Sequence, residues 1–152
     1  MSPYNKILVL CQGNICRSPV AEALLKRQLP DRQIQSAGLT AMVGHGADAT
    51  AAEIAGADDL DLAGHSARQV TTDMIQWADL VLVMSQGQRS QVGQYAPEAI
   101  GKTLLLGHWL GAPGQSAGQQ KDIPDPYKKS RDVFEHVHKL MAQGVALWSQ
   151  KI

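Results

Sequence analysis

The chain has 152 residues, 44% of them hydrophobic, and its 14 basic and 14 acidic side chains give a formal net charge of zero. This length suits one compact domain over residues 1–152, and the balanced charge argues against nucleic acid or an anionic membrane as a partner. The N-terminal apolar run is too short to span a bilayer and lacks the pattern of a signal peptide, so we expect a cytoplasmic protein. Cys11 and Cys16 are the two cysteines, a count that argues against a secreted disulfide framework.

Short apolar runs alternate with helix-like segments along the chain. The expected strands are residues 6–10, 33–36, 80–84 and 103–106. The expected helices are residues 19–29, 48–57, 71–77, 86–94 and 130–150. Residues 111–120 are rich in Gly, Gln and Ser and are expected to form a surface loop. This alternation predicts an α/β fold with a four-stranded parallel sheet and helices on both of its faces, of the Rossmann or flavodoxin type.

Two details of the helices can be predicted as well. Ser18 and Asp48 precede the first two helical runs and are expected to act as their N-caps. In the last helix, one apolar face is predicted from the residues that recur at helical spacing, namely Val133, Val137, Leu140, Met141, Leu147 and Trp148.

The first expected strand runs directly into the segment Cys11-Gln-Gly-Asn-Ile-Cys-Arg-Ser-Pro19. Ligands of parallel sheets bind beyond the C-terminal ends of the strands, and Cys11 falls there. Backbone N–H groups of such a loop and the start of a helix can converge on an anion. Arg17 would add a planar fork that takes two phosphoryl oxygens. The segment therefore predicts a phosphate-binding loop that holds a phosphoryl group against a nucleophilic sulfur.

The residues between the cysteine and the arginine fit this interpretation. Gly13 permits a close approach that a side chain would block, and Asn14 tolerates a left-handed backbone or can lock the loop through its amide. The Ser18 hydroxyl lies where it can donate to the Cys11 sulfur. The alternative is that Cys11 is a small buried hydrophobe and Arg17 a surface charge, but the complete stretch is far more specific than its two end residues.

The group that leaves phosphorus departs more easily when a carboxylic acid supplies it with a proton. Asp122 and Asp125 both lie in the loop before the last helix, and Pro124 and Pro126 stiffen the backbone around Asp125. By composition alone, an aspartate between prolines is more often a turn former than a catalyst.

The segment from Cys11 to Pro19 closely resembles the signature loop of the low molecular weight protein tyrosine phosphatases. The resemblance extends over essentially the whole chain, through Ser36-Ala-Gly38, Gly64-His-Ser-Ala-Arg-Gln69 and Asp125-Pro-Tyr127. Pro124-Asp-Pro-Tyr127 and Gly107-His-Trp109 are similar to the bacterial group that is paired with tyrosine autokinases of capsule and exopolysaccharide export.

This resemblance implies a protein-tyrosine-phosphatase that works through a cysteinyl-phosphate intermediate. It makes Cys11 the nucleophile, Arg17 the phosphate-binding arginine and Asp125 the general acid, which later acts as base. Gln12, Gly13, Asn14, Ile15, Cys16 and Ser18 complete the phosphate-binding loop. Tyr127 is a wall for the aromatic ring, Ser36 and His65 support the loop, and Ser36 is expected to bond to Asn14.

The resemblance also bears on partners and regulation. Cys16 would form a reversible disulfide with Cys11 under oxidation. The protein substrate would be a tyrosine autokinase, and the chain would be a monomer or a weak dimer. We expect no cofactor and no metal, since the histidines show no metal-site pattern.

Three other functions are less consistent with these residues. An arsenate reductase on the same fold needs further cysteines, and none follows Cys16. A protein-arginine phosphatase of this family carries a threonine where Ile15 stands. A phosphotyrosine-binding module without turnover has no use for Cys11 and Asp125. This chain differs from the family pattern at Ser85, where many relatives carry an acidic residue. If that acid orients the arginine of the loop in the relatives, Glu22 is the candidate to orient Arg17 here.

Overall fold

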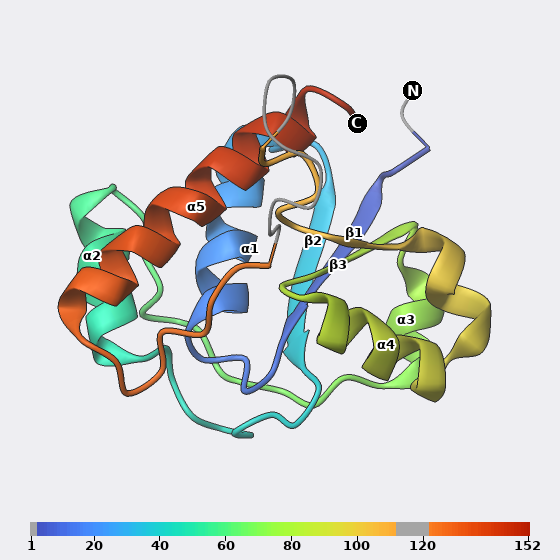
Figure 1. Ribbon diagram of the computed structural model, residues 1–152, viewed down its shortest axis with the longest axis horizontal. Helices are drawn as coiled ribbons and strands as arrows, with labels where there is room; N and C mark the ends of the chain where they lie inside the picture. Colours follow the sequence, from blue (N-terminus) through green and yellow to red (C-terminus); the bar gives the residue numbers. More distant parts are fainter. Residues whose placement is uncertain (1–2, 112–121) are drawn as a thin grey trace.

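The computed structural model describes residues 3–111 and 122–152, and within them four strands form one sheet (Figure 1). These strands are β1 (Lys6–Cys11), β2 (Gln33–Gly38), β3 (Leu80–Val83) and β4 (Thr103–Leu105). Their order is β2-β1-β3-β4 and every pairing is parallel. The predicted α/β fold with a four-stranded parallel sheet is confirmed. The predicted loop over residues 111–120 lies, apart from Gly111, outside the described residues.

Helices cover both faces of this sheet. They are α1 (Arg17–Gln28), α2 (Ala49–Ala57), α3 (Thr72–Trp77), α4 (Gln86–Tyr95) and α5 (Arg131–Ser149), with a 3₁₀ helix, η1 (Pro97–Lys102), that the sequence did not predict. Figure 1 shows α1, α2 and α5 on one side of the sheet and α3 and α4 on the other. All five predicted helices are therefore present.

The apolar core lies in two layers, one on each face. Successive side chains of a strand point to opposite faces, so Ile7 and Val9 of β1 pack towards α1 and α5, whereas Leu8 and Leu10 pack towards α3 and α4. This double burial explains why the run from Ile7 to Leu10 is apolar throughout instead of alternating.

Of the two predicted N-caps, Ser18 was wrong and Asp48 is confirmed. Helix α1 begins at Arg17, so Ser18 lies inside it, where its hydroxyl contacts the Cys11 sulfur at 3.0 Å and does not cap the helix. Asp48 does cap α2, since its carboxylate accepts hydrogen bonds from Thr50 N and Ala51 N.

The buried face of α5 is rotated from the predicted stripe. It consists of Phe134, Val137, Met141, Gly144, Val145 and Trp148, so Val133, Leu140 and Leu147 are less buried than expected. Gly144 lies on this face, where the helix passes close to the chain after β4. A Cβ at this position would lie 2.9 Å from the carbonyl oxygen of Leu106. Glycine carries no apolar side chain, so the helical spacing of apolar residues does not indicate its place on the buried face.

None of the helices in the described part of the chain has both the length and the apolar character that crossing a membrane requires.

Candidate active site

The Cys11 sulfur lies at the C-terminal end of β1, buried at the base of the loop that leads into α1. It accepts hydrogen bonds from Asn14 N at 3.3 Å and Ser18 N at 3.4 Å, and it lies 3.0 Å from Ser18 Oγ. The predicted contact between the Ser18 hydroxyl and the sulfur is confirmed. Donors grouped in this way stabilise negative charge on sulfur, which is the form in which cysteine attacks.

Asn14 holds this loop in shape from a fully buried position. Its φ of 61° is left-handed, as predicted for an asparagine here. Nδ2 donates to Ser18 Oγ at 2.7 Å and to Ser36 Oγ at 3.1 Å, while Oδ1 accepts from the backbone N–H of Arg68 at 3.0 Å. The Asn14 carbonyl lies 2.6 Å from Nε2 of His65, which must carry the hydrogen because a carbonyl only accepts.

The structure thus brings Ser36 and His65 to the loop, where the resemblance put them. Arg68 was missed as a contact of Asn14. Its backbone N–H makes the bond, and a backbone group leaves no signal in the sequence.

The Arg17 guanidinium lies at the start of α1 and is largely buried. NH1 donates to the carbonyl oxygen of Ile123 at 2.7 Å, and NH2 lies 3.7 Å from Oδ2 of Asp125. The expectation that Glu22 orients Arg17 was wrong. Five residues along a helix turn a side chain by roughly 140°, so Glu22 faces away from Arg17. Ser85 caps α4 by accepting from Gln88 N at 3.2 Å.

Asp125 lies above the loop with its side chain 52% exposed. Its Oδ1 accepts from Tyr127 N at 3.1 Å, which fixes the turn, and Oδ2 faces Arg17. Asp122, the other candidate, accepts from Gln86 N at 3.0 Å at the start of α4 and has a structural role there. The structure therefore places Asp125, and not Asp122, over the sulfur-bearing loop.

A cavity of about 200 Å³ opens above the Cys11 sulfur. Its lining consists of Cys11, Gln12, Gly13, Ile15, Cys16, Arg17, Thr40, Met42, Asp125 and Tyr127. Ile15, Met42 and Tyr127 make apolar walls around a polar base. Thr40 and Met42 were missed, although their place just beyond the end of β2 is where ligands of parallel sheets bind. Thr40 also accepts a hydrogen bond from Gln12 Nε2 at 2.8 Å.

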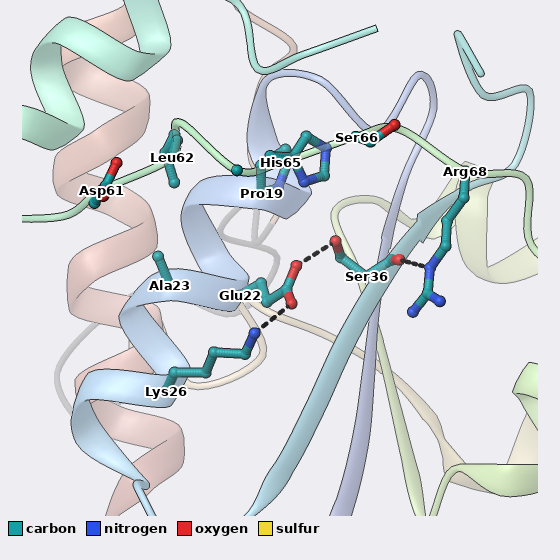
Figure 2. Close-up of a pocket in the computed structure, with 11 residues that line it drawn as sticks. Pro19, Glu22, Ala23, Lys26, Ser36, Asp61, Leu62, His65, Ser66 and Arg68 are labelled. Carbon is teal, nitrogen blue, oxygen red and sulfur yellow. Dashed lines mark hydrogen bonds and ion pairs between the residues drawn. The ribbon is translucent and has the colours of Figure 1, made fainter. Parts of the chain in front are cut away.

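A second cavity, of about 440 Å³, lies behind the loop and is shown in Figure 2. It is enclosed by α1, β2 and residues 61–68, and its lining includes Glu22, Lys26, Ser36, His65 and Arg68. Ser36 and His65, which both bond to Asn14, therefore line this second cavity and not the one above the Cys11 sulfur.

Cys16 shares the wall of the first cavity, and both cysteines are free thiols. Burial, and after it the negative charges of Asp48, Cys11 and Asp125, raise the pKa of the Cys16 thiol to about 12, against a smaller lowering by the Arg17 charge. Cys16 is thus protonated at neutral pH. The disulfide between them stays a prediction.

This raised pKa predicts a loss of stability in alkaline solution. The unfolded chain releases the Cys16 proton near pH 9, whereas the folded chain keeps it up to about pH 12. Above pH 9 the unfolded state therefore binds fewer protons, so the free energy of unfolding falls as the pH rises. We expect Cys16 to account for a fall of about 1 kcal/mol between pH 8 and pH 10. Urea unfolding at both pH values should show a smaller fall for Cys16→Ser than for the parent protein; an equal fall would contradict the shifted pKa.

Comparison with known proteins shows where this arrangement recurs. The family model for low molecular weight phosphotyrosine protein phosphatases matches residues 6–152. The protein-tyrosine-phosphatase Wzb of Salmonella typhimurium is 46% identical over 149 residues, which cover 98% of this chain and 95% of the relative. The crystal structure of the tyrosine phosphatase Wzb from Escherichia coli K30 with sulphate superposes with a TM-score of 0.90 at 43% identity, covering 97% and 98% of the two chains. The YwlE arginine phosphatase of Geobacillus stearothermophilus is similar at 32% identity and a TM-score of 0.86, covering 98% of this chain and 92% of that one.

Proposed function

Because the chain belongs to the low molecular weight phosphotyrosine protein phosphatase family, we propose that it hydrolyses protein phosphotyrosine through a phosphocysteine formed on Cys11. One observation carries the proposal. The Cys11 sulfur, with three donors within 3.4 Å, sits at the base of a cavity that also holds the Arg17 guanidinium and the Asp125 carboxyl group.

In the first step the Cys11 thiolate attacks phosphorus, and an S–P bond forms as the bond from phosphorus to the phenolic oxygen breaks. The electron pair of the broken bond goes to the phenolic oxygen, which takes a proton from Asp125 and leaves as tyrosine. Arg17 binds the phosphoryl oxygens as charge develops on them. The Ile123 carbonyl uses one of the five guanidinium N–H groups and holds the fork in position.

In the second step water attacks phosphorus and gives its proton to the Asp125 carboxylate. The S–P bond breaks and the sulfur leaves as a thiolate, so inorganic phosphate is released and Asp125 returns to its acid form. The donors around the sulfur favour this departure because they stabilise the charge that the sulfur regains.

The shape of the cavity supports phosphotyrosine as the substrate. Ile15, Met42 and Tyr127 form apolar walls above the polar base, which suits the flat face of a phenol ring better than a guanidinium. We further propose a bacterial tyrosine autokinase of polysaccharide export, on the cytoplasmic side, as the protein substrate. This choice is supported by the segments Pro124–Tyr127 and Gly107–Trp109 and by the likeness to Wzb.

The test is a direct comparison of three peptides of identical sequence that carry phosphotyrosine, phosphoserine or phosphoarginine. We expect kcat/KM to be highest for phosphotyrosine. A higher kcat/KM for phosphoarginine would assign the chain to the arginine-specific branch, and no turnover of any of the three would refute the proposed function.

A further inference from the structure

Glu22 lies behind the phosphate-binding loop, on the side of α1 that faces β2. Figure 2 shows its carboxylate between Ser36 and Lys26, in the wall of the larger cavity. One carboxylate oxygen accepts a hydrogen bond from Ser36 Oγ at 2.6 Å, and the other lies 2.8 Å from the Lys26 ammonium. The Glu22 side chain is 19% exposed and that of Lys26 is 57% exposed. The contact with Ser36 therefore points into the protein and the contact with Lys26 towards solvent.

The hydrogen atoms of this contact have fixed directions. A carboxylate can only accept, so the single hydroxyl hydrogen of Ser36 is directed at Glu22. The Ser36 oxygen is then left as an acceptor towards Asn14, whose Nδ2 lies 3.1 Å away.

The donor and acceptor of each following hydrogen bond, from Asn14 to the Cys11 sulfur, are fixed in the same way. Nδ2 of Asn14 has two hydrogens, of which one goes to Ser36 and the other to Ser18 Oγ at 2.7 Å. Because Ser18 Oγ accepts this bond, its own hydrogen is available for the Cys11 sulfur at 3.0 Å. Ser18 and Asn14 are fully buried, so water is poorly placed to replace either of them, whereas Ser36 borders the larger cavity.

We propose that Glu22 is a positioning residue for the phosphatase reaction. Through Ser36 and Asn14, it holds the Ser18 hydroxyl with its hydrogen directed at the Cys11 sulfur. This inference rests on the proposed function, in which that sulfur both attacks phosphorus and leaves it. The surface ion pair with Lys26 is a separate contact, since exposed pairs of this spacing contribute little.

Three single variants separate these roles. Glu22→Ala removes the acceptor and keeps a good helix former, and kcat for a phosphotyrosine peptide should fall by about tenfold, the scale of one lost hydrogen bond to a charged group. Glu22→Gln should retain most of kcat, because its amide oxygen can accept the Ser36 hydroxyl. Lys26→Ala should match the parent, because it breaks the ion pair and leaves the contact between Glu22 and Ser36 in place. A Glu22→Gln variant as slow as Glu22→Ala, or parent kcat in Glu22→Ala, would overturn the proposal.

A double-mutant cycle with Ser36 tests the route of the effect. If Glu22 acts through Ser36, then Glu22→Ala should cause no further loss of kcat in a Ser36→Ala background. Two losses that multiply in full would show that Glu22 acts independently of Ser36 and would contradict the proposal.

The rate at which iodoacetate alkylates Cys11, followed by mass spectrometry of its peptide, gives a readout that needs no turnover. We expect it to be several-fold slower in Glu22→Ala than in the parent and Lys26→Ala, at a temperature at which all three proteins are folded. This measurement also separates the two proposals. A parent protein that hydrolyses no phosphotyrosine would refute the proposed function, while equal alkylation rates in all variants would refute the role of Glu22.

Discussion

Replacing Cys11 with serine is expected to abolish phosphatase turnover while phosphate binding stays measurable. The donors that surround the sulfur, Asn14 N, Ser18 N and the Ser18 hydroxyl, act on the side chain at position 11. A serine hydroxyl is far less acidic than a thiol, so these donors cannot make it an effective nucleophile at neutral pH. We expect kcat to fall by roughly 10⁴–10⁶-fold, the range for removal of a catalytic nucleophile. Arg17 and the backbone of the loop are unchanged, and they should still bind inorganic phosphate in a calorimetric titration.

The matched control is Cys16→Ser. The raised pKa of Cys16 keeps this thiol protonated at neutral pH, so Cys16→Ser keeps the nucleophile and should retain the turnover that Cys11→Ser loses. Acid quenching of the parent during turnover, followed by mass spectrometry, should recover phosphate on Cys11. Substantial turnover by Cys11→Ser, or phosphate recovered on Cys16, would contradict the assignment.

The fold was predictable because each of its signals lies within a short stretch of sequence. The run from Ile7 to Leu10 is buried on both faces, and its continuous apolar character indicated a central parallel strand. The loop from Cys11 to Arg17 was predictable for the same reason, since its cysteine, asparagine and arginine lie within seven consecutive residues.

Contacts between segments that are far apart in the sequence were harder to predict. Arg17 is held by the carbonyl of Ile123, 106 residues away, and Asn14 by the N–H of Arg68, 54 residues away. Every residue carries these backbone groups, so composition and spacing do not distinguish the ones that reach the site. The role of Glu22 was predictable only in part. The sequence singled out a carboxylate near the loop, but its partner, Ser36, depends on how α1 packs against β2.

Asp125 is the second residue whose replacement should have a large effect. Asp125→Asn is expected to lower kcat by about 10²–10⁴-fold for aryl phosphates with poor leaving groups, because the leaving oxygen no longer receives a proton. The substitution is well matched to the question. An asparagine oxygen can still accept the hydrogen bond that Tyr127 N makes with Oδ1 at 3.1 Å, so the turn over the cavity is preserved. Asp122→Asn is the control, since its oxygen can still cap α4 at Gln86 N, and kcat should match the parent.

The dependence on the leaving group distinguishes proton donation from other roles of Asp125. A phenolate that is already stable needs little help, so the loss in Asp125→Asn should shrink as the leaving phenol becomes more acidic. A plot of log kcat/KM, which reports only the first step, against the pKa of the leaving phenol should be shallow for the parent and steep for the variant. Oδ2 also lies 3.7 Å from Arg17 NH2, and a role confined to that ion pair would lower kcat/KM by the same factor for every phenol. Parallel lines in the plot would therefore assign Asp125 to the support of Arg17, and converging lines would assign it to proton transfer.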